Sequence, residues 1–205
     1  MNIRIMSMSP LTRPSLSIEY ALLGFLRRRP MHGYQIHRQL SDPAGLGLVW
    51  RLKQSQLYAL LAKLEDEGYI TARLRTQDAR PPRKVFRLTR AGRDAFLDWV
   101  SSPVSHGRQI RLEFLAKFYF ARQEGLEVAA TLIERQQAAC RNWLDAQQKQ
   151  AESVRESQPY NWLVSQFRIS QIKAMLAWLE ICQQTLAMDR PLASLPPSSK
   201  GISPG

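Results

Sequence analysis

Apolar residues recur at helical spacing in three short segments of the first half of the chain, residues 17–29, 33–40 and 53–68. Their inward positions are Ile18, Leu22, Phe25 and Leu26 in the first, Ile36 and Leu40 in the second, and Leu57, Leu60, Leu61 and Leu64 in the third. Ser15 or Ser17 can cap the first helix, which Pro30 stops. Gly68 has the residue type usual just past a helix end.

The period then changes from helical to alternating. Ile70, Ala72 and Leu74 point one way and the residues between them the other, which predicts a half-buried strand. A turn with two prolines and a second strand over 85–89 complete a hairpin, and 90–100 returns to helix. The order helix, helix, helix, hairpin, helix predicts a winged helix-turn-helix over residues 15–100, whose third helix enters the DNA major groove.

The second half of the chain is predicted to be helical. Residues 101–107 form a linker by composition, and the helical region 108–188 comprises segments near 108–122, 126–156 and 162–188. Apolar spacing near 3.5 residues predicts long helices that pack along their length. The predicted inward positions include Trp143, Val164, Phe167, Met175 and Trp178. Residues 1–14 and 189–205 are expected to be flexible tails. The fold class is therefore mainly α with a small β-hairpin.

A layer of two long helices and a short one is too thin to hide Trp143, Trp162 and Trp178 within one subunit. A homodimer whose partner covers these side chains is therefore expected. The main alternative for the set Trp143, Trp162, Phe167, Met175 and Trp178 is a pocket for a small effector, because aromatic and Met side chains suit flat apolar ligands.

Charge favours a polyanionic partner. The net charge is +12, and residues 1–105 hold 17 Lys and Arg against 8 Asp and Glu. No apolar run is long enough for a membrane span or a secretory signal, so a cytoplasmic protein without a membrane partner is expected. The three Met residues among the first eight leave the true start codon open. Cys140 and Cys182 lack metal-ligand spacing and are expected to be buried thiols.

Four stretches together resemble the PadR family of transcriptional regulators: "LLGFL", "PMHGYQI", "QLYALLAKLEDEGYI" and "RKVFRLTRAGR". Their order and spacing match the family over about residues 18–100, and "RLEFLAKFYF" with a late "AWLE" resembles the C-terminal helices of its longer members. The resemblance implies a winged helix, a dimer made by the C-terminal helices, and a repressor that is often released by a small aromatic or apolar effector. Ala59 stands where the family often has Pro, and Val85 and Phe86 stand where it often has two aromatic residues.

The predicted DNA contacts follow from the winged-helix interpretation. Gln54, Ser55 and Gln56 lie at the N-terminal end of the third helix, where side chains reach base edges. Phosphate contacts are expected from Tyr58 and Lys63 on that helix. Arg80, Arg83 and Lys84 on the wing are expected to approach either the DNA backbone or the narrow minor groove. Tyr34 matches the Tyr of the family's "HGY". It is expected either to touch phosphate or to pack between helices.

Enzyme and cofactor chemistry is not expected. His32 and His37 miss the i, i+4 spacing of a metal pair, and His106 stands alone in the linker. Asp98 and Glu113 have no visible partner, and no phosphate loop or nucleophile elbow occurs. We therefore expect a sequence-specific homodimeric repressor that binds double-stranded DNA at an inverted repeat. One alternative is a basic winged-helix module that binds protein or anionic surfaces. Another is an RNA-binding protein, but the predicted strands show no exposed aromatic residues that would form a stacking platform for bases.

Overall fold

A computed structural model describes residues 19–77 and 80–188, with the side chains of 75–82 left aside. The expected tails at 1–14 and 189–205 and the expected caps Ser15 and Ser17 lie outside the described residues. Contacts divide the chain into two compact units, residues 1–99 and 100–205, and each is described by itself.

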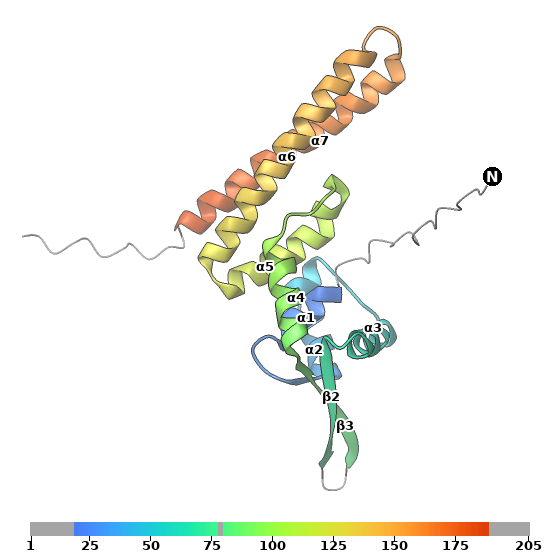
Figure 1. Ribbon diagram of the computed structural model, residues 1–205, viewed down its shortest axis with the longest axis vertical. Coiled ribbons are helices and arrows are strands. Elements are labelled where there is room, and N and C mark those ends of the chain that lie inside the picture. Colours follow the sequence, from blue (N-terminus) through green and yellow to red (C-terminus); the bar gives the residue numbers. More distant parts are fainter. Residues whose placement is uncertain (1–18, 78–79, 189–205) are drawn as a thin grey trace, which may run out of the picture. The chain divides into compact units, whose positions relative to one another are not determined.

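The first unit is built from short helices (Figure 1), and their apolar side chains are buried in a shared core. They are α1 (Glu19–Leu26), α2 (Gly33–Leu40), a 3₁₀ turn at Leu46–Leu48, α3 (Gln54–Asp66) and α4 (Arg90–Ser101). The predicted inward residues of the first three segments are buried apart from Ile18, which lies outside the described residues, and Leu60, which is half-buried. A helix of eight residues cannot stabilise itself in water, so α1 and α2 depend on this shared core.

A three-stranded antiparallel sheet in the order β1–β3–β2 completes this unit, within the described residues. It consists of β1 (Met31–His32), β2 (Ile70–Gln77) and β3 (Arg80–Leu88), and Met31 pairs with Phe86. The strand β1 was not predicted, because two residues are too few to show an alternating pattern. The strands of the hairpin also run further toward its tip than the predicted loop allowed.

Leu74 corrects one detail of the predicted strand. Ile70 is buried, as expected, but Leu74 on the same side of β2 is 68% exposed. The hairpin extends past the helices (Figure 1). The alternation of apolar and polar residues along β2 therefore continues into a part of the strand that has no core to cover Leu74. Where the hairpin joins α4, the Thr89 hydroxyl donates to the Gly68 carbonyl at 2.8 Å and accepts from the Gly92 N–H at 3.0 Å, capping the helix.

The second unit is helical in its described part. After α4 it contains a 3₁₀ turn at Gly107–Gln109, a π-helical turn at Ile110–Phe114, α5 (Leu115–Glu124), α6 (Leu126–Val154) and α7 (Pro159–Met188). The long helices α6 and α7 run side by side along their length (Figure 1). Their shared core includes Leu132, Ile133, Cys140, Leu179 and Cys182, so both thiols are buried as predicted.

The predicted inward face of α7 was wrong at Phe167, which is 62% exposed. The buried positions of this helix are Ser165, Ile169, Ile172, Leu179, Cys182 and Leu186. Trp178, which was expected to need a partner subunit, packs against Phe114 and Phe118 with ring centroids 5.9 and 6.5 Å apart. Two faces of α7 carry apolar residues, and the sequence pattern alone did not separate them.

The expected fold class is confirmed: a winged helix-turn-helix is followed by a helical C-terminal region. Among the described residues, no helix has both the length and the apolar character that crossing a bilayer would require.

Candidate nucleic-acid interface and ligand pocket

The N-terminal end of α3 presents small and amide side chains to solvent. Gln54, Ser55 and Gln56 are all exposed there, as are Ala59 and Ala62 on later turns of the same face. The opposite face is held in the core by Leu57, Leu61 and Leu64. The helix therefore offers hydrogen-bonding groups on a narrow surface that lacks bulky side chains at its start.

Gln56 also has a structural task that the sequence prediction missed. Its Oε1 accepts a hydrogen bond from the Lys53 N–H at 3.1 Å, at the point where α3 begins. This satisfies one backbone donor beside the helix start. In a bidentate contact to adenine, Gln56 would have to share its Oε1 between the base and the Lys53 N–H, whereas Gln54 and Ser55 are exposed without such a bond among the described contacts. We therefore rank Gln54 and Ser55 above Gln56 as base contacts.

Tyr58 lies against the start of α2. A Cβ on Gly33 would stand 2.6 Å from the Tyr58 ring, so only glycine allows this approach. Tyr58 stays 41% exposed and Tyr34 is 61% exposed. Of the two alternatives for Tyr34, its exposure favours the phosphate contact over packing between helices.

Lys63 is a weaker phosphate candidate than the sequence indicated. Its Nζ donates to both carboxylate oxygens of Glu19 at 2.9 Å and lies 3.8 Å from Glu67. The hydrogen bond to Glu19 raises the pKa of Lys63 above its usual value. The cation is therefore neutralised locally by α1, and a phosphate would have to compete with Glu19.

The wing carries more exposed cations than were predicted. Arg83 is exposed, and Lys84 is exposed but lies 3.4 Å from Glu65; the side chain of Arg80 lies outside the described part. The register pairs Arg73 with Val85 and Thr71 with Arg87. Directly paired residues share a face of the sheet, so Arg73 and Arg87 both lie on the face turned away from Ile70 and Phe86.

Arg73 and Arg87, together with Arg83, form what we call the arginine face of the wing; all three are exposed. The alternation of β2 had placed Arg73 outward. It was not predicted as a DNA contact, because only the cations near the hairpin tip were considered. Lys53 was also missed. It directly precedes α3, is exposed, and stands beside the candidate base contacts. A cation next to a helix that points at bases is the usual sequence signal of a phosphate contact.

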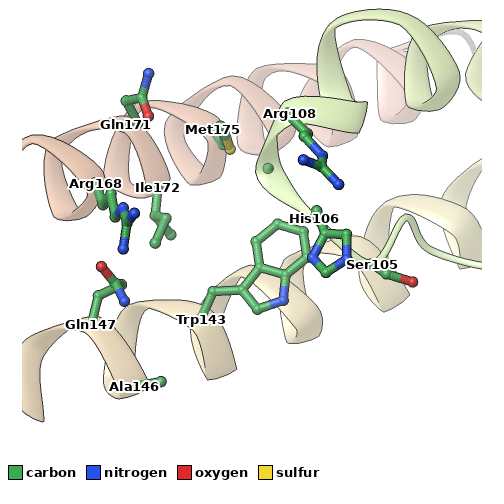
Figure 2. A pocket seen from close by; sticks show the side chains of 11 residues that line it. Ser105, His106, Arg108, Trp143, Ala146, Gln147, Arg168, Gln171, Ile172 and Met175 are labelled. Carbon is green, nitrogen blue, oxygen red and sulfur yellow. The ribbon is translucent and has the colours of Figure 1, made fainter. Parts of the chain in front are cut away.

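A pocket of about 630 Å³ lies within the second unit, between α6, α7 and the segment Ser105–Arg108 (Figure 2). Its lining residues are Ser105, His106, Gly107, Arg108, Trp143, Ala146, Gln147, Arg168, Gln171, Ile172 and Met175. The structure thus brings Trp143 and Met175 of the predicted effector set together. Trp162, Phe167 and Trp178 do not line it. Its volume falls in the range of small-molecule sites.

The polar groups of the pocket are unbalanced. Two of its lining residues, Arg108 and Arg168, are cations, and none of the described lining residues is Asp or Glu. The Oε1 of Gln147 is shielded from solvent and has no hydrogen-bond donor among the described residues. Neither arginine was singled out by the sequence, because their place in one pocket depends on how α7 folds back along α6.

No group of three or more potential metal ligands gathers in the part of the chain that the structure describes. The His32 Nδ1 lies 3.1 Å from the Lys84 carbonyl oxygen, and the backbone N–H of His106 donates to Gln109 Oε1 at 2.9 Å.

Comparisons with known proteins agree with this architecture. Residues 22–98 match the transcriptional regulator PadR-like family, and residues 110–187 match the Virulence activator alpha C-term family. The chain is 31% identical over 172 residues to the negative transcriptional regulator PadR of Bacillus subtilis, covering 80% of this chain and 93% of that protein. The chain belongs to the PadR-like family. It is therefore a transcriptional regulator of PadR type, and this is a family of regulators rather than enzymes.

Solved structures similar to this PadR-like protein include B. subtilis PadR with operator DNA, at 30% identity and a TM-score of 0.42. B. subtilis PadR with p-coumaric acid matches at 28% identity and a TM-score of 0.37. Each covers 83% of this chain and 98% of that chain. The PadR-like family match itself covers α1 to α4 with the wing, which hold all the candidate DNA contacts.

Proposed function

We propose that this PadR-like regulator is a cytoplasmic homodimeric repressor that binds an inverted repeat in double-stranded DNA and is released by a small effector. The observation that carries the DNA contact is the exposed N-terminal end of α3, flanked by Lys53 and accompanied by the arginine face of the wing. Amide and hydroxyl groups suit base edges, and guanidinium groups suit phosphates.

In this arrangement α3 enters the major groove. Gln54 and Ser55 contact bases, and Gln56 contributes through its amide N–H groups while its Oε1 stays on Lys53. Phosphate contacts come from Tyr34, Tyr58, Lys53 and the wing residues Arg73, Arg80, Arg83, Lys84 and Arg87. Because so many cations take part, affinity should fall steeply as salt rises.

A homodimer is supported by the outer face of α7. Five large apolar side chains lie exposed on this helix: Tyr160, Leu163, Phe167, Ile181 and Met188. Tyr160, Phe167, Ala174, Ile181 and Met188 follow one another at every seventh position, and Leu163 and Ala177 add the intermediate position of a heptad. We call this set the α7 stripe.

The α7 stripe lies opposite the face that packs on α6. Phe167 and Ile181 each follow a buried residue, Ser165 and Leu179, by two positions, which is about 200° around a helix. A monomer would leave this apolar line in water, whereas the same stripe on a second copy is self-complementary about a two-fold axis. Such a dimer would present two copies of α3 to half-sites about one turn, ~10 bp, apart or a multiple of it.

Repression and release are supported separately. The B. subtilis relative carries the name of a negative regulator, which favours repression. The pocket in the second unit offers space for a small aromatic or apolar molecule next to Trp143 and Met175. Release would follow if an occupied pocket favoured a dimer with the wrong spacing between its two α3 helices.

The test is selection of DNA by the full-length protein from a pool of duplexes with randomised centres, at two salt concentrations. Enrichment of an inverted repeat that persists at the higher salt supports the proposal. Recovery of unrelated sequences, lost together as salt rises, would overturn sequence-specific binding and leave a basic module for protein or anionic surfaces.

A further inference from the structure

We infer that the pocket between α6, α7 and Ser105–Arg108 is the effector site, and that it selects a flat aromatic molecule with an acidic group at each end. This inference rests on the proposed function for its regulatory meaning. The binding claim itself concerns only the second unit and can be tested without DNA.

The charge of the pocket points to an anion. Arg108 and Arg168 line it, and no described lining residue supplies a carboxylate to neutralise them. The salt bridges of the described residues involve neither arginine. An arginine in a concave site donates well-aligned, charge-assisted hydrogen bonds to a carboxylate, and two such residues favour two acidic groups over one.

The positions of the two arginines set the form of the ligand. In Figure 2 the guanidinium groups of Arg168 and Arg108 are well separated, with Ile172 and the Trp143 indole between them. Met175 lies across from Trp143. A ligand that reaches both cations must therefore pass an apolar and aromatic middle, which a rigid flat ring system fills with little entropy loss.

The pocket also involves the chain that leads from the winged helix. His106 and Arg108 belong to the segment after α4, and residues just before it are held by polar side chains of α5 and α6. The Gln136 Oε1 accepts from the Val104 N–H at 2.8 Å, Arg135 donates to the Ser101 carbonyl at 2.8 Å, and Lys117 donates to the Ser102 carbonyl at 3.0 Å. A ligand bound to Arg108 and Arg168 would thus tie this anchored segment to α7.

The experiment is isothermal titration of the full-length protein, free of DNA, with three matched naphthalene probes. They are 2,6-naphthalenedicarboxylate, 2-naphthoate and 2,6-bis(hydroxymethyl)naphthalene. We expect the dicarboxylate to bind about 10- to 100-fold more tightly than the monocarboxylate, and the neutral diol to bind most weakly. Equal affinity for all three, or tighter binding of the diol, would overturn the charge selection.

Three variants test whether the probes bind in this pocket. Arg108→Gln and Arg168→Gln should each reduce dicarboxylate affinity to about that of the monocarboxylate. Arg141→Gln removes the same charge from an exposed position of α6 that does not line this pocket, so its affinity should match that of the unchanged protein. Circular dichroism confirms that each variant folds. Loss of affinity in the Arg141 variant as large as in the other two would overturn the placement.

Regulation is measured separately, by operator affinity with and without saturating dicarboxylate. A fall of ten-fold or more in the unchanged protein, absent in Arg168→Gln, supports effector action. Tight dicarboxylate binding with unchanged operator affinity would overturn the effector role and leave a binding site. If the protein bound no DNA sequence selectively, the proposed function would fail, while the ranking of the three probes would still decide the binding claim.

Discussion

The exposed face of α3 is polar, whereas the exposed face of α7 is apolar. The exposed face of α3 begins with Gln54, Ser55 and Gln56, whereas the α7 stripe exposes Phe167 and Ile181 at 62% and 59%. Both helices bury their opposite side in a core. The contrast indicates different partners: a hydrated polar surface for α3, and another apolar surface for α7.

This difference also shows why helical spacing alone is an incomplete guide. In α3 the apolar positions form one stripe, so periodicity identified both its inner and its outer face. In α7 apolar residues occur on two opposite sides, so periodicity could not tell which side packs on α6.

The double variant Phe167→Glu/Ile181→Glu should break the dimer. Carboxylates buried in an apolar interface without partners cost several kcal/mol, so we expect the dimer dissociation constant to rise by ~100-fold or more. Sedimentation equilibrium measures this change. The matched control, Gln148→Glu/Gln150→Glu, adds the same charge at exposed positions of α6 and should leave the dimer intact. A dimer that survives the first change would show that the α7 stripe is not the interface.

Gln136→Ala should destabilise the second unit. Gln136 is fully buried and its Oε1 accepts from the buried Val104 N–H at 2.8 Å. Removal leaves that N–H without an acceptor, so the free energy of unfolding should fall by ~1–3 kcal/mol, measured by urea denaturation. Gln148→Ala, at an exposed position of α6, should cost less than ~0.5 kcal/mol. Similar losses in both variants would contradict a structural role for the buried amide.

Gln136 illustrates what sequence reasoning missed. In the apolar pattern of α6 a glutamine is only an interruption, because its acceptor role depends on Val104, which lies 32 residues earlier in the chain. The winged helix was predictable because its contacts are local and its order of elements is distinctive. The pocket arginines and the strand β1 were not, since both depend on segments that meet only in the folded chain.

For α3, too, the sequence predicted some features of the candidate DNA contacts and missed others. Exposure of Gln54, Ser55 and Gln56 followed from spacing, but the hydrogen bond from the Lys53 N–H to Gln56 did not. The predicted phosphate contact of Lys63 assumed a free ammonium group, whereas Glu19 from α1 neutralises it. Charge counts locate basic regions of a sequence, and only the fold shows which cations remain available.

Gln56→Ala should therefore act on stability as well as on DNA. Loss of its bond at the start of α3 should lower the free energy of unfolding by ~0.5–2 kcal/mol, measured by urea denaturation. Ser55→Ala should leave stability nearly unchanged and instead cost ~1–3 kcal/mol of discrimination at one base pair of the selected operator. A stable Gln56→Ala protein would contradict its capping role. Unaltered base preference in Ser55→Ala would contradict its place in the groove.

Arg73→Gln and Lys63→Gln should separate an available cation from a neutralised one. The slope of log affinity against log salt should become shallower by ~0.9 for Arg73→Gln and stay the same for Lys63→Gln, measured by fluorescence anisotropy with the operator. Lys63 is bound to Glu19 at 2.9 Å and is not expected to neutralise a phosphate, so its removal should leave the number of phosphate contacts unchanged. A change of slope in the lysine variant alone would reverse the assignment of the two residues.

The buried thiols of Cys140 and Cys182 should react slowly with thiol reagents and should affect stability only at alkaline pH. Burial raises the pKa of Cys182 from 9.0 to about 11 and also raises that of Cys140. Native protein at pH 8 should therefore react with a thiol reagent far more slowly than protein unfolded in guanidinium. Between pH 9 and 11 the unfolded Cys182 thiol ionises while the folded one stays protonated, so this residue's contribution to stability falls as pH rises. Rapid native labelling at pH 8 would contradict the buried packing of α6 and α7.

The most direct test of DNA recognition is a titration of the full-length protein against two duplexes of equal length. One contains the DNA upstream of its own coding sequence and the other a scrambled version, each followed by fluorescence anisotropy at two salt concentrations. We predict a preference of ~10³ or more for the native duplex that persists at the higher salt. Equal binding to both duplexes, lost together as salt rises, would contradict recognition of that duplex by α3 and point to a basic surface alone.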